Sequence, residues 1–179
     1  MLPDEQTVLA RILAWAESEE AVRAVVLTSG RAREDETVDL LSDYDVVVAL
    51  TDLERFDAAA AYGVPAASWG DEHLVHGLST LFRGVVYEDG VKVDWSLWPA
   101  SALPLVAEHG LTDDLDVGYR VLLDRDGATA AWPPASHRAH IPAPPSEDEY
   151  RALVEEFWWS TTYVAKALWR GERIGRAHV

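Results

Sequence analysis

Apolar residues recur with two different periods in the first fifty residues of the chain. Residues 4–20 carry apolar side chains at helical spacing, which predicts an amphipathic helix. Two short apolar runs rich in β-branched residues follow at 22–28 and 46–50. Such runs are typical of buried strands. The polar and charged segment 29–42 between them is expected to form a loop.

A second group of elements surrounds a turn signal in the middle of the chain. Alternating apolar and polar residues at 81–87 and 91–98 flank Asp89-Gly90. Because Asp-Gly favours tight turns, this pattern predicts a β-hairpin. Four further elements are expected: a helix at 52–61, an irregular stretch at 62–71, a short helix at 101–109 and a last strand at 117–123.

The C-terminal part has a different pattern. Residues 132–145 are rich in proline and indicate a stiff linker. Ser146, with Glu149 at capping-box spacing, begins a long predicted helix. We therefore predict a first domain at 1–131, this linker, and the start of a helical C-terminal domain at 146–179. One helix face is apolar, and a second runs from aromatic to basic: Trp159, Tyr163, Lys166 and Arg170.

Composition narrows the classes of function. The chain has 179 residues, no cysteine and a formal charge of −16. The absence of cysteine excludes disulfides, zinc-thiolate sites and cysteine nucleophiles. The negative charge argues against nucleic acid as the main partner and favours a small cationic one. No apolar run is long enough for a membrane helix, and the N-terminus lacks a secretion signal, so a cytoplasmic protein is expected.

Three aspartates carry the candidate chemistry. Asp43 and Asp45 open the second predicted strand, and alternate residues of a strand point to the same face. Two adjacent carboxylates repel each other unless a cation lies between them, and oxygen ligands favour Mg²⁺. Asp94 lies on the second arm of the hairpin, where a carboxylate needs a partner or a role. The pattern predicts metal-dependent phosphoryl or nucleotidyl transfer.

Other metal-ligand patterns are weaker. Two His-x-x-His pairs, His73/His76 and His137/His140, lack any cysteine partner. Asp113-Asp114-x-Asp116 lacks the spacing of a calcium loop and is expected to be a solvated turn or a helix entrance.

Together these motifs resemble a known family. Ser29-Gly30-Arg31, Ser42-Asp43-Tyr44-Asp45 and Lys92-Val93-Asp94 resemble the nucleotidyltransferase superfamily of DNA polymerase β type. The aspartate motifs and the Phe-Trp-Trp helix at 156–169 look more closely like the aminoglycoside 6-adenylyltransferase (streptomycin adenylyltransferase) family. The resemblance implies an α+β nucleotidyltransferase fold, a mixed β-sheet with helices packed on one face, followed by a helical C-terminal segment.

The resemblance also implies an activity: transfer of AMP from ATP to a hydroxyl of an aminoglycoside, with Mg²⁺ as the metal and release of pyrophosphate. Asp43, Asp45 and Asp94 match the three acidic positions of the family. Ser29, Gly30 and Arg31 match the turn that holds the nucleotide phosphates, and Lys166 matches a lysine expected to contact the triphosphate. Asp94 is a metal ligand or a general base in this hypothesis.

Two departures from the family accompany these matches. Superfamily members usually read Gly-Ser at the phosphate turn, whereas this chain reads Ser29-Gly30. The chain also ends soon after the Phe-Trp-Trp helix, so we expect an incomplete C-terminal domain. Two alternatives therefore stay open: a nucleotidyltransferase with a different acceptor, and a non-catalytic nucleotide-binding or partner module. The oligomeric state is not predicted.

Overall fold

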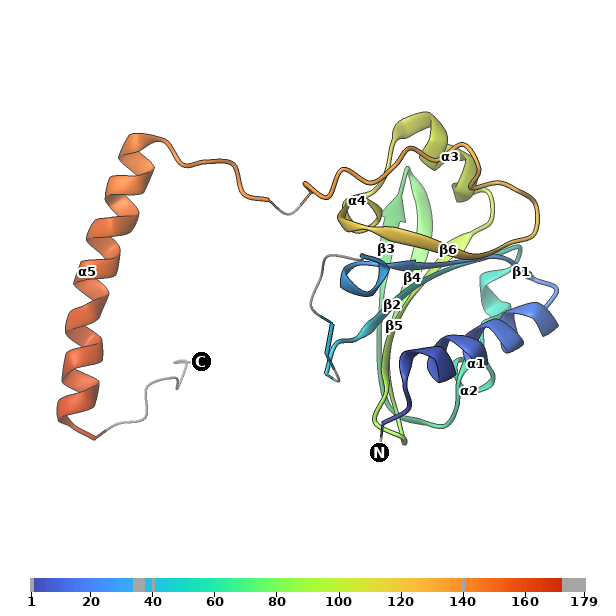
Figure 1. Cartoon of the computed structure of the whole chain (residues 1–179), viewed down its shortest axis with the longest axis horizontal. Coiled ribbons are helices and arrows are strands. Elements are labelled where there is room, and N and C mark those ends of the chain that lie inside the picture. Colours follow the sequence, from blue (N-terminus) through green and yellow to red (C-terminus); the bar gives the residue numbers. More distant parts are fainter. Residues whose placement is uncertain (1, 34–37, 40, 140, 172–179) are drawn as a thin grey trace. The chain divides into compact units, whose positions relative to one another are not determined.

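The chain forms two compact units. The computed structural model describes residues 2–33, 38–39, 41–139 and 141–171. One unit spans Met1–His140 and the other Ile141–Val179 (Figure 1). Each unit is described by itself below.

A six-stranded sheet forms the framework of the first unit. Its strand order is β3-β4-β5-β2-β1-β6. Only β2 and β5 pair in parallel; the other neighbours are antiparallel, so the sheet is mixed. The strands are β1 (Val22–Thr28), β2 (Tyr44–Leu50), β3 (Pro65–Val75), β4 (Leu78–Tyr87), β5 (Lys92–Pro99) and β6 (Tyr119–Asp124).

One face of the sheet packs beneath α1 (Glu5–Ser18) and the short α2 (Ala58–Ala61). The Asp4 side chain caps α1 by accepting a hydrogen bond from the Thr7 amide at 2.7 Å. Helical spacing then directs one stripe of α1 onto the sheet, and its residues Val8, Ile12, Trp15 and Ala16 are buried. The predicted N-terminal helix and the first two strands are thus confirmed.

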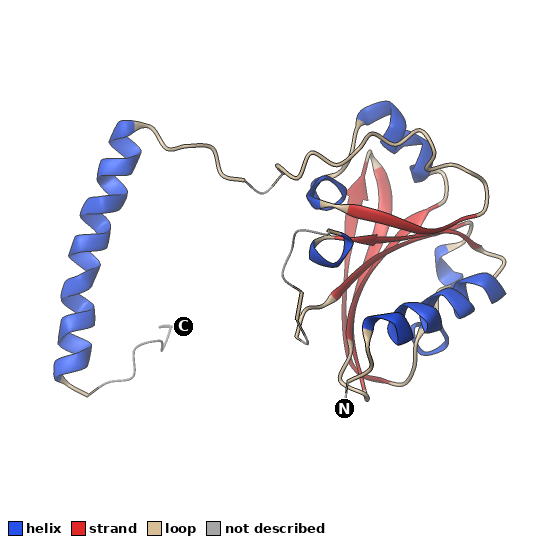
Figure 2. Ribbon diagram, viewed as in Figure 1, coloured by secondary structure: helices blue, strands red, loops and turns tan. Residues whose placement is uncertain are grey.

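The opposite face carries a second helical layer, α3 (Ala102–His109) and α4 (Asp113–Val117) (Figure 2). The predicted α+β class with a mixed sheet is confirmed, but helices cover parts of both faces. Trp132 belongs to this second core, and its Nε1 donates to the Leu103 carbonyl at 2.9 Å. Residues 132–139, which we assigned to the linker, therefore lie within the first unit.

Two local predictions are wrong. The stretch 62–71 was expected to be irregular, but Pro65–Val75 forms the edge strand β3. Its side chains are almost all exposed, so it has no apolar alternation, and its pairing with β4 makes it a strand. The segment 52–61 was expected to be one helix. It forms a 3-10 turn at Leu53–Arg55 and then α2, which the Asp57 side chain caps.

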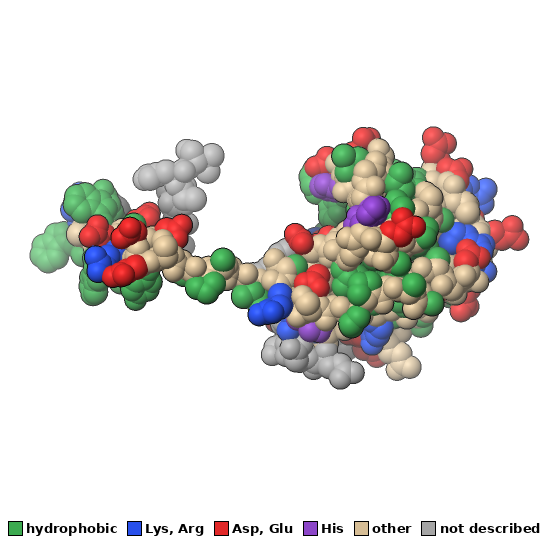
Figure 3. Space-filling model, turned by 90° about the horizontal axis from the view of Figure 1, so that it is seen from above, with side chains coloured by type: hydrophobic (Ala, Val, Ile, Leu, Met, Phe, Trp, Pro, Cys, Tyr) green, Lys and Arg blue, Asp and Glu red, His purple; other side chains and the backbone are tan. Residues whose placement is uncertain are grey.

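The second unit contains the long helix α5 (Glu147–Trp169). The predicted capping box is confirmed: the Glu149 amide donates to Ser146 Oγ at 3.3 Å, and the Ser146 amide donates to Glu149 Oε2 at 2.8 Å. None of the α5 residues is buried, and both apolar and acidic side chains lie on its surface (Figure 3).

No helix among the described residues is long and apolar enough to cross a membrane.

Candidate active site

The parallel pairing of β2 and β5 brings two of the predicted aspartates side by side. In this register Asp45 lies directly opposite Asp94, and both line one cleft of about 390 Å³. Neighbouring strands are about 4.8 Å apart, so side chains at paired positions of one face are near neighbours. Two residues separated by 49 positions in the chain thus place their carboxylates on the same face of the sheet.

Asp43 joins this pair through a lysine. Lys92 Nζ donates to Asp43 Oδ2 at 2.5 Å and to Asp94 Oδ2 at 2.9 Å. Lys92 precedes Asp94 by two residues, and strand alternation places both side chains on one face. These hydrogen bonds, that to Asp43 first, raise the pKa of the Lys92 ammonium. A positive charge therefore already stands between two of the three carboxylates.

Asp45 lies where negative charge is in excess. Burial, and then the charge of Asp94, raise the pKa of Asp45 to about 6. A hydrogen bond from the Ser29 side chain opposes that rise. The Asp94 side chain is only 18% exposed, and its Oδ1 is buried with no hydrogen-bond partner among the described residues. An orphaned carboxylate oxygen is costly unless a cation or donor reaches it.

The turn after β1 places Ser29 at this cleft and shows which position of the Ser29-Gly30 pair has the glycine-like backbone. Ser29 has φ 60° and ψ −149°, a conformation that favours glycine. Gly30 has no positive φ, and a Cβ there would meet nothing within 4 Å. The glycine-like backbone therefore belongs to position 29, where this chain carries a serine, and its side chain reaches Asp45.

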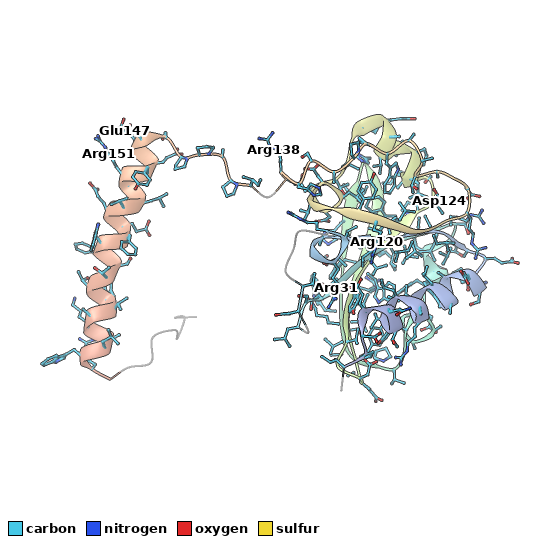
Figure 4. The ribbon with its side chains drawn as sticks, viewed as in Figure 1. Arg31, Arg120, Asp124, Arg138, Glu147 and Arg151 are labelled. Atoms are coloured by element: carbon cyan, nitrogen blue, oxygen red, sulfur yellow. The ribbon has the colours of Figure 1, made fainter. Side chains whose placement is uncertain are left out.

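Arg31 has a structural role in the loop before β2. Its Nε donates to the Asp43 carbonyl at 2.9 Å, its Nη2 to the Ser42 carbonyl at 2.7 Å and its Nη1 to Glu5 Oε2 at 3.2 Å. The guanidinium also stacks on the Tyr44 ring at 3.9 Å, and the side chain is only 8% exposed. Figure 4 labels it at the edge of the first unit. Arg31 therefore fixes the backbone that carries Asp43, and its phosphate contact stays a prediction.

A fourth carboxylate was missed by the sequence reasoning. Asp114 lies in the first turn of α4 and lines the same cleft as Asp45 and Asp94. Its charge contributes to the raised pKa of Asp45. The Asp113-Asp114-x-Asp116 motif was noted, but nothing local in it indicates which of its side chains faces the sheet. Asp116 instead binds the segment after Trp132, accepting from the Ser136 amide and hydroxyl, both at 2.7 Å.

The other candidate residues belong to other elements, and one of them, His73, also lines the cleft. Lys166 is on α5, in the second unit, with its Nζ 5.4 Å from the Tyr163 ring centre. His76 packs against His109, whereas His73 lies beside Phe82. His137 contacts the Val117 carbonyl at 2.6 Å, and His140 lies outside the described residues.

The donor set fits a hard divalent cation, although no ion site is preformed. In the part of the chain that the structure describes, no three ligating side chains form a ready cluster. The Lys92 ammonium occupies the space between Asp43 and Asp94. All candidate donors are carboxylate oxygens, which suit Mg²⁺, and one of them, Asp94 Oδ1, has no partner. A cation that reached Asp94 would satisfy that oxygen, whereas Lys92 contacts the other oxygen, Oδ2.

Comparison with known proteins decides the family. The model of the streptomycin adenylyltransferase family matches residues 2–174. The chain belongs to that family. The match spans the three aspartates, the turn at 29–31 and the whole of α5, so the resemblance found in the sequence is confirmed.

Curated relatives carry the name aminoglycoside 6-adenylyltransferase. The Bacillus subtilis (strain 168) relative is 27% identical over 176 residues, and the Campylobacter jejuni relative is 26% identical over 186 residues. These matches cover 94% of this chain but 60% and 59% of those relatives, so the chain spans about three fifths of their length. A crystal structure of an aminoglycoside 6-adenyltransferase from Bacillus subtilis aligns with a TM-score of 0.48 at 24% identity, covering 96% of this chain and 59% of that one.

Proposed function

We propose that this chain transfers AMP from ATP to a hydroxyl of an aminoglycoside of the streptomycin type and releases pyrophosphate. Family membership supports adenylyl transfer, and one observation carries the chemistry. Asp45 and Asp94 pair directly across parallel strands, in a cleft where Asp94 Oδ1 has no partner. Such an arrangement stabilises the anionic pair only when positive charge enters the cleft.

The proposed donor site is Mg·ATP held by carboxylates and the turn after β1. Asp43, Asp45 and Asp94 would hold the metal, which when bound lowers the pKa of the acceptor hydroxyl and neutralises phosphate charge. The Ser29 hydroxyl would donate to a phosphate oxygen, and open space beside Gly30 admits the triphosphate close to the backbone. Lys166 remains a proposed triphosphate contact. ATP as co-substrate would place the reaction in the cytoplasm.

The proposed reaction is a single displacement. The acceptor oxygen bonds to the α-phosphorus while the bond from that phosphorus to the bridging oxygen breaks, and pyrophosphate leaves. The hydroxyl proton passes to Asp94 or to solvent. Lys92 Nζ would leave its present position between Asp43 and Asp94, and its charge would stay near the reacting phosphate.

Release of pyrophosphate from ATP tests the proposal. We expect release that requires Mg²⁺ and an aminoglycoside, with streptomycin as the first acceptor in a panel. Asp94→Asn should be inactive. If this variant still binds Mg·ATP as the wild type does, Asp94 acts as a base; if binding is lost, it acts as a metal ligand. No release with any aminoglycoside in the panel would contradict the proposed function.

A further inference from the structure

A single cross-strand row runs through the candidate site and beyond it. Successive pairings join Thr28 to Asp45, Asp45 to Asp94, Asp94 to Gly84 and Gly84 to Trp69. Paired positions share a face, so this row places a tryptophan two strands from the carboxylate of Asp94. With strands about 4.8 Å apart, the Asp94 and Trp69 backbones are about 10 Å apart, and only a glycine lies between them.

That glycine forms the floor of a hollow of about 400 Å³. Trp69 and Phe82 form an aromatic wall, with ring centres 5.4 Å apart, and Lys92 and Asp94 form an ionic wall. A Cβ at Gly84 would lie 3.2 Å from Asp94 Oδ1 and 3.3 Å from Phe82 Cε1. Any side chain at this position would therefore crowd both walls.

This aromatic hollow and the cleft that holds Asp45 are neighbours. Both are lined by Asp94 and Phe82, whereas Ser29 and Asp45 line only the cleft and Trp69 lines only the hollow. In a displacement at phosphorus the attacking and leaving oxygens lie on opposite sides of that atom. If the triphosphate binds beside Ser29 and Asp45, the attacking hydroxyl must approach from the other side of Asp94.

We propose that the aromatic hollow binds the acceptor, with a ring of the aminoglycoside between Trp69 and Asp94. This inference rests on the proposed function, because it takes the cleft beside Asp45 as the donor site. Trp69 is 63% exposed, so its indole face is open to a ligand. Protonated amino or guanidino groups bind well to a tryptophan face and to a carboxylate. The aromatic wall and Asp94 together thus select a cationic ring and set its hydroxyl beside Asp94.

Substitution of Trp69 tests the acceptor site directly. Streptomycin is titrated into the full chain by calorimetry, with Mg²⁺ and the non-cleavable analogue α,β-methylene-ATP present. We expect Trp69→Ala to weaken streptomycin binding about tenfold, and Trp69→Phe to restore most of it. The affinity for the ATP analogue should not change. Val121→Ala is the matched control, because Val121 is 37% exposed on β6, at the other edge of the sheet.

The outcomes separate this inference from the proposed function. Wild-type protein that binds streptomycin but releases no pyrophosphate would contradict the function, while a loss in Trp69→Ala would still support the hollow as the binding site. Unchanged streptomycin affinity in Trp69→Ala would overturn the acceptor site. A loss of affinity for the ATP analogue instead would identify the hollow as the adenine site and also overturn it. Wild-type protein that does not bind streptomycin would contradict both proposals.

A second variant tests the space at Gly84, beneath the proposed position of the aminoglycoside ring. Gly84→Ala places a methyl group against Asp94 and Phe82, so we expect a higher KM for streptomycin and a kcat lower by about tenfold. Gly63→Ala is the control, because a Cβ at Gly63 meets nothing within 4 Å. Normal kcat and KM in Gly84→Ala would contradict the proposed position of the acceptor.

Discussion

Strands β2 and β5 present two different faces. Toward α1 they carry a core of buried side chains: Tyr44, Val46, Val48, Leu50, Val93, Trp95 and Leu97. On the opposite face, the same strands carry Asp45 and Asp94 near their N-terminal ends. Apolar Val47 and Trp98 follow further along.

The difference shows how one pair of strands serves two purposes. Because side chains alternate with period two, neighbouring residues contribute separately to the core and to the cleft. The core face supplies stability through burial of apolar area. The cleft face concentrates negative charge and one unpartnered oxygen, which destabilises the free protein and favours binding of a cation. Substitutions on the two faces should therefore have opposite consequences.

The largest expected effect is on activity from the cleft face. Asp45→Asn should lower kcat/KM for pyrophosphate release about a thousandfold or more, because the neutral amide holds a cation poorly. The variant should remain folded. Glu17→Gln is the control, since Glu17 is an exposed carboxylate on α1, the helix that covers the opposite face of the sheet from the cleft. Near-normal turnover in Asp45→Asn would show that the cleft face of β2 and β5 does not carry the activity.

The core face should give the largest effect on stability. Trp95 is fully buried, packs edge-on against Trp15, and its Nε1 donates to Tyr87 Oη at 3.0 Å. Trp95→Ala should lower the free energy of unfolding by about 3–5 kcal/mol. Trp69→Ala also removes a tryptophan side chain, but an exposed one, and should change that free energy by no more than about 0.5 kcal/mol. Equal losses in urea denaturation would show that the comparison is wrong.

The pH dependence of stability sharpens the comparison. The pKa of Asp45 is raised to about 6 from 3.8, so the folded state binds more protons between those values than the unfolded state does. Stability from this group is therefore present at low pH and lost as pH rises from about 4 to 6, by up to about 3 kcal/mol.

The difference in stability between the wild type and Asp45→Asn isolates the contribution of Asp45. Asp116 and Asp124 have lowered pKa values and act in the opposite sense, so the wild type is compared with Asp45→Asn at each pH. We expect the variant to match the wild type near pH 4 and to be the more stable protein above about pH 6. Saturating Mg²⁺ should reduce that gap. A gap that does not change with pH would refute the raised pKa.

The smallest expected effect concerns the turn at the cleft. Alanine is ordinarily more stable than glycine at a given position, but the positive φ of Ser29 should reverse this order. Ser29→Gly should be more stable than Ser29→Ala by about 1 kcal/mol, since both lose the hydroxyl and only glycine relieves the backbone. Thermal unfolding measures the difference, and Gly30→Ala serves as a neutral control. If Ser29→Ala were the more stable variant, the backbone at position 29 would not be strained.

Part of this arrangement could be predicted from the sequence. Periodicity and turn chemistry predicted the hairpin of β4 and β5 and the cap of α5. The edge strand β3 could not be found this way, because its exposed residues lack an apolar pattern and it depends on pairing with β4. It carries Trp69.

Long-range contacts set the remaining details of the site. Arg31 belongs to the turn predicted to hold phosphates, and its guanidinium donates to backbone carbonyls that only the folded loop brings near. Asp114 reaches the cleft through the packing of α4 on the sheet. Neither position has a local signal, because both depend on tertiary packing rather than on periodicity or spacing.

Calorimetric titration of α,β-methylene-ATP with and without Mg²⁺ tests most directly whether the paired carboxylates form a metal-nucleotide site. We predict that the wild type and Glu17→Gln bind the analogue only when Mg²⁺ is present, and that Asp45→Asn loses about a hundredfold or more in affinity. Binding by the wild type that does not depend on Mg²⁺, or equal affinity in Asp45→Asn, would contradict the account.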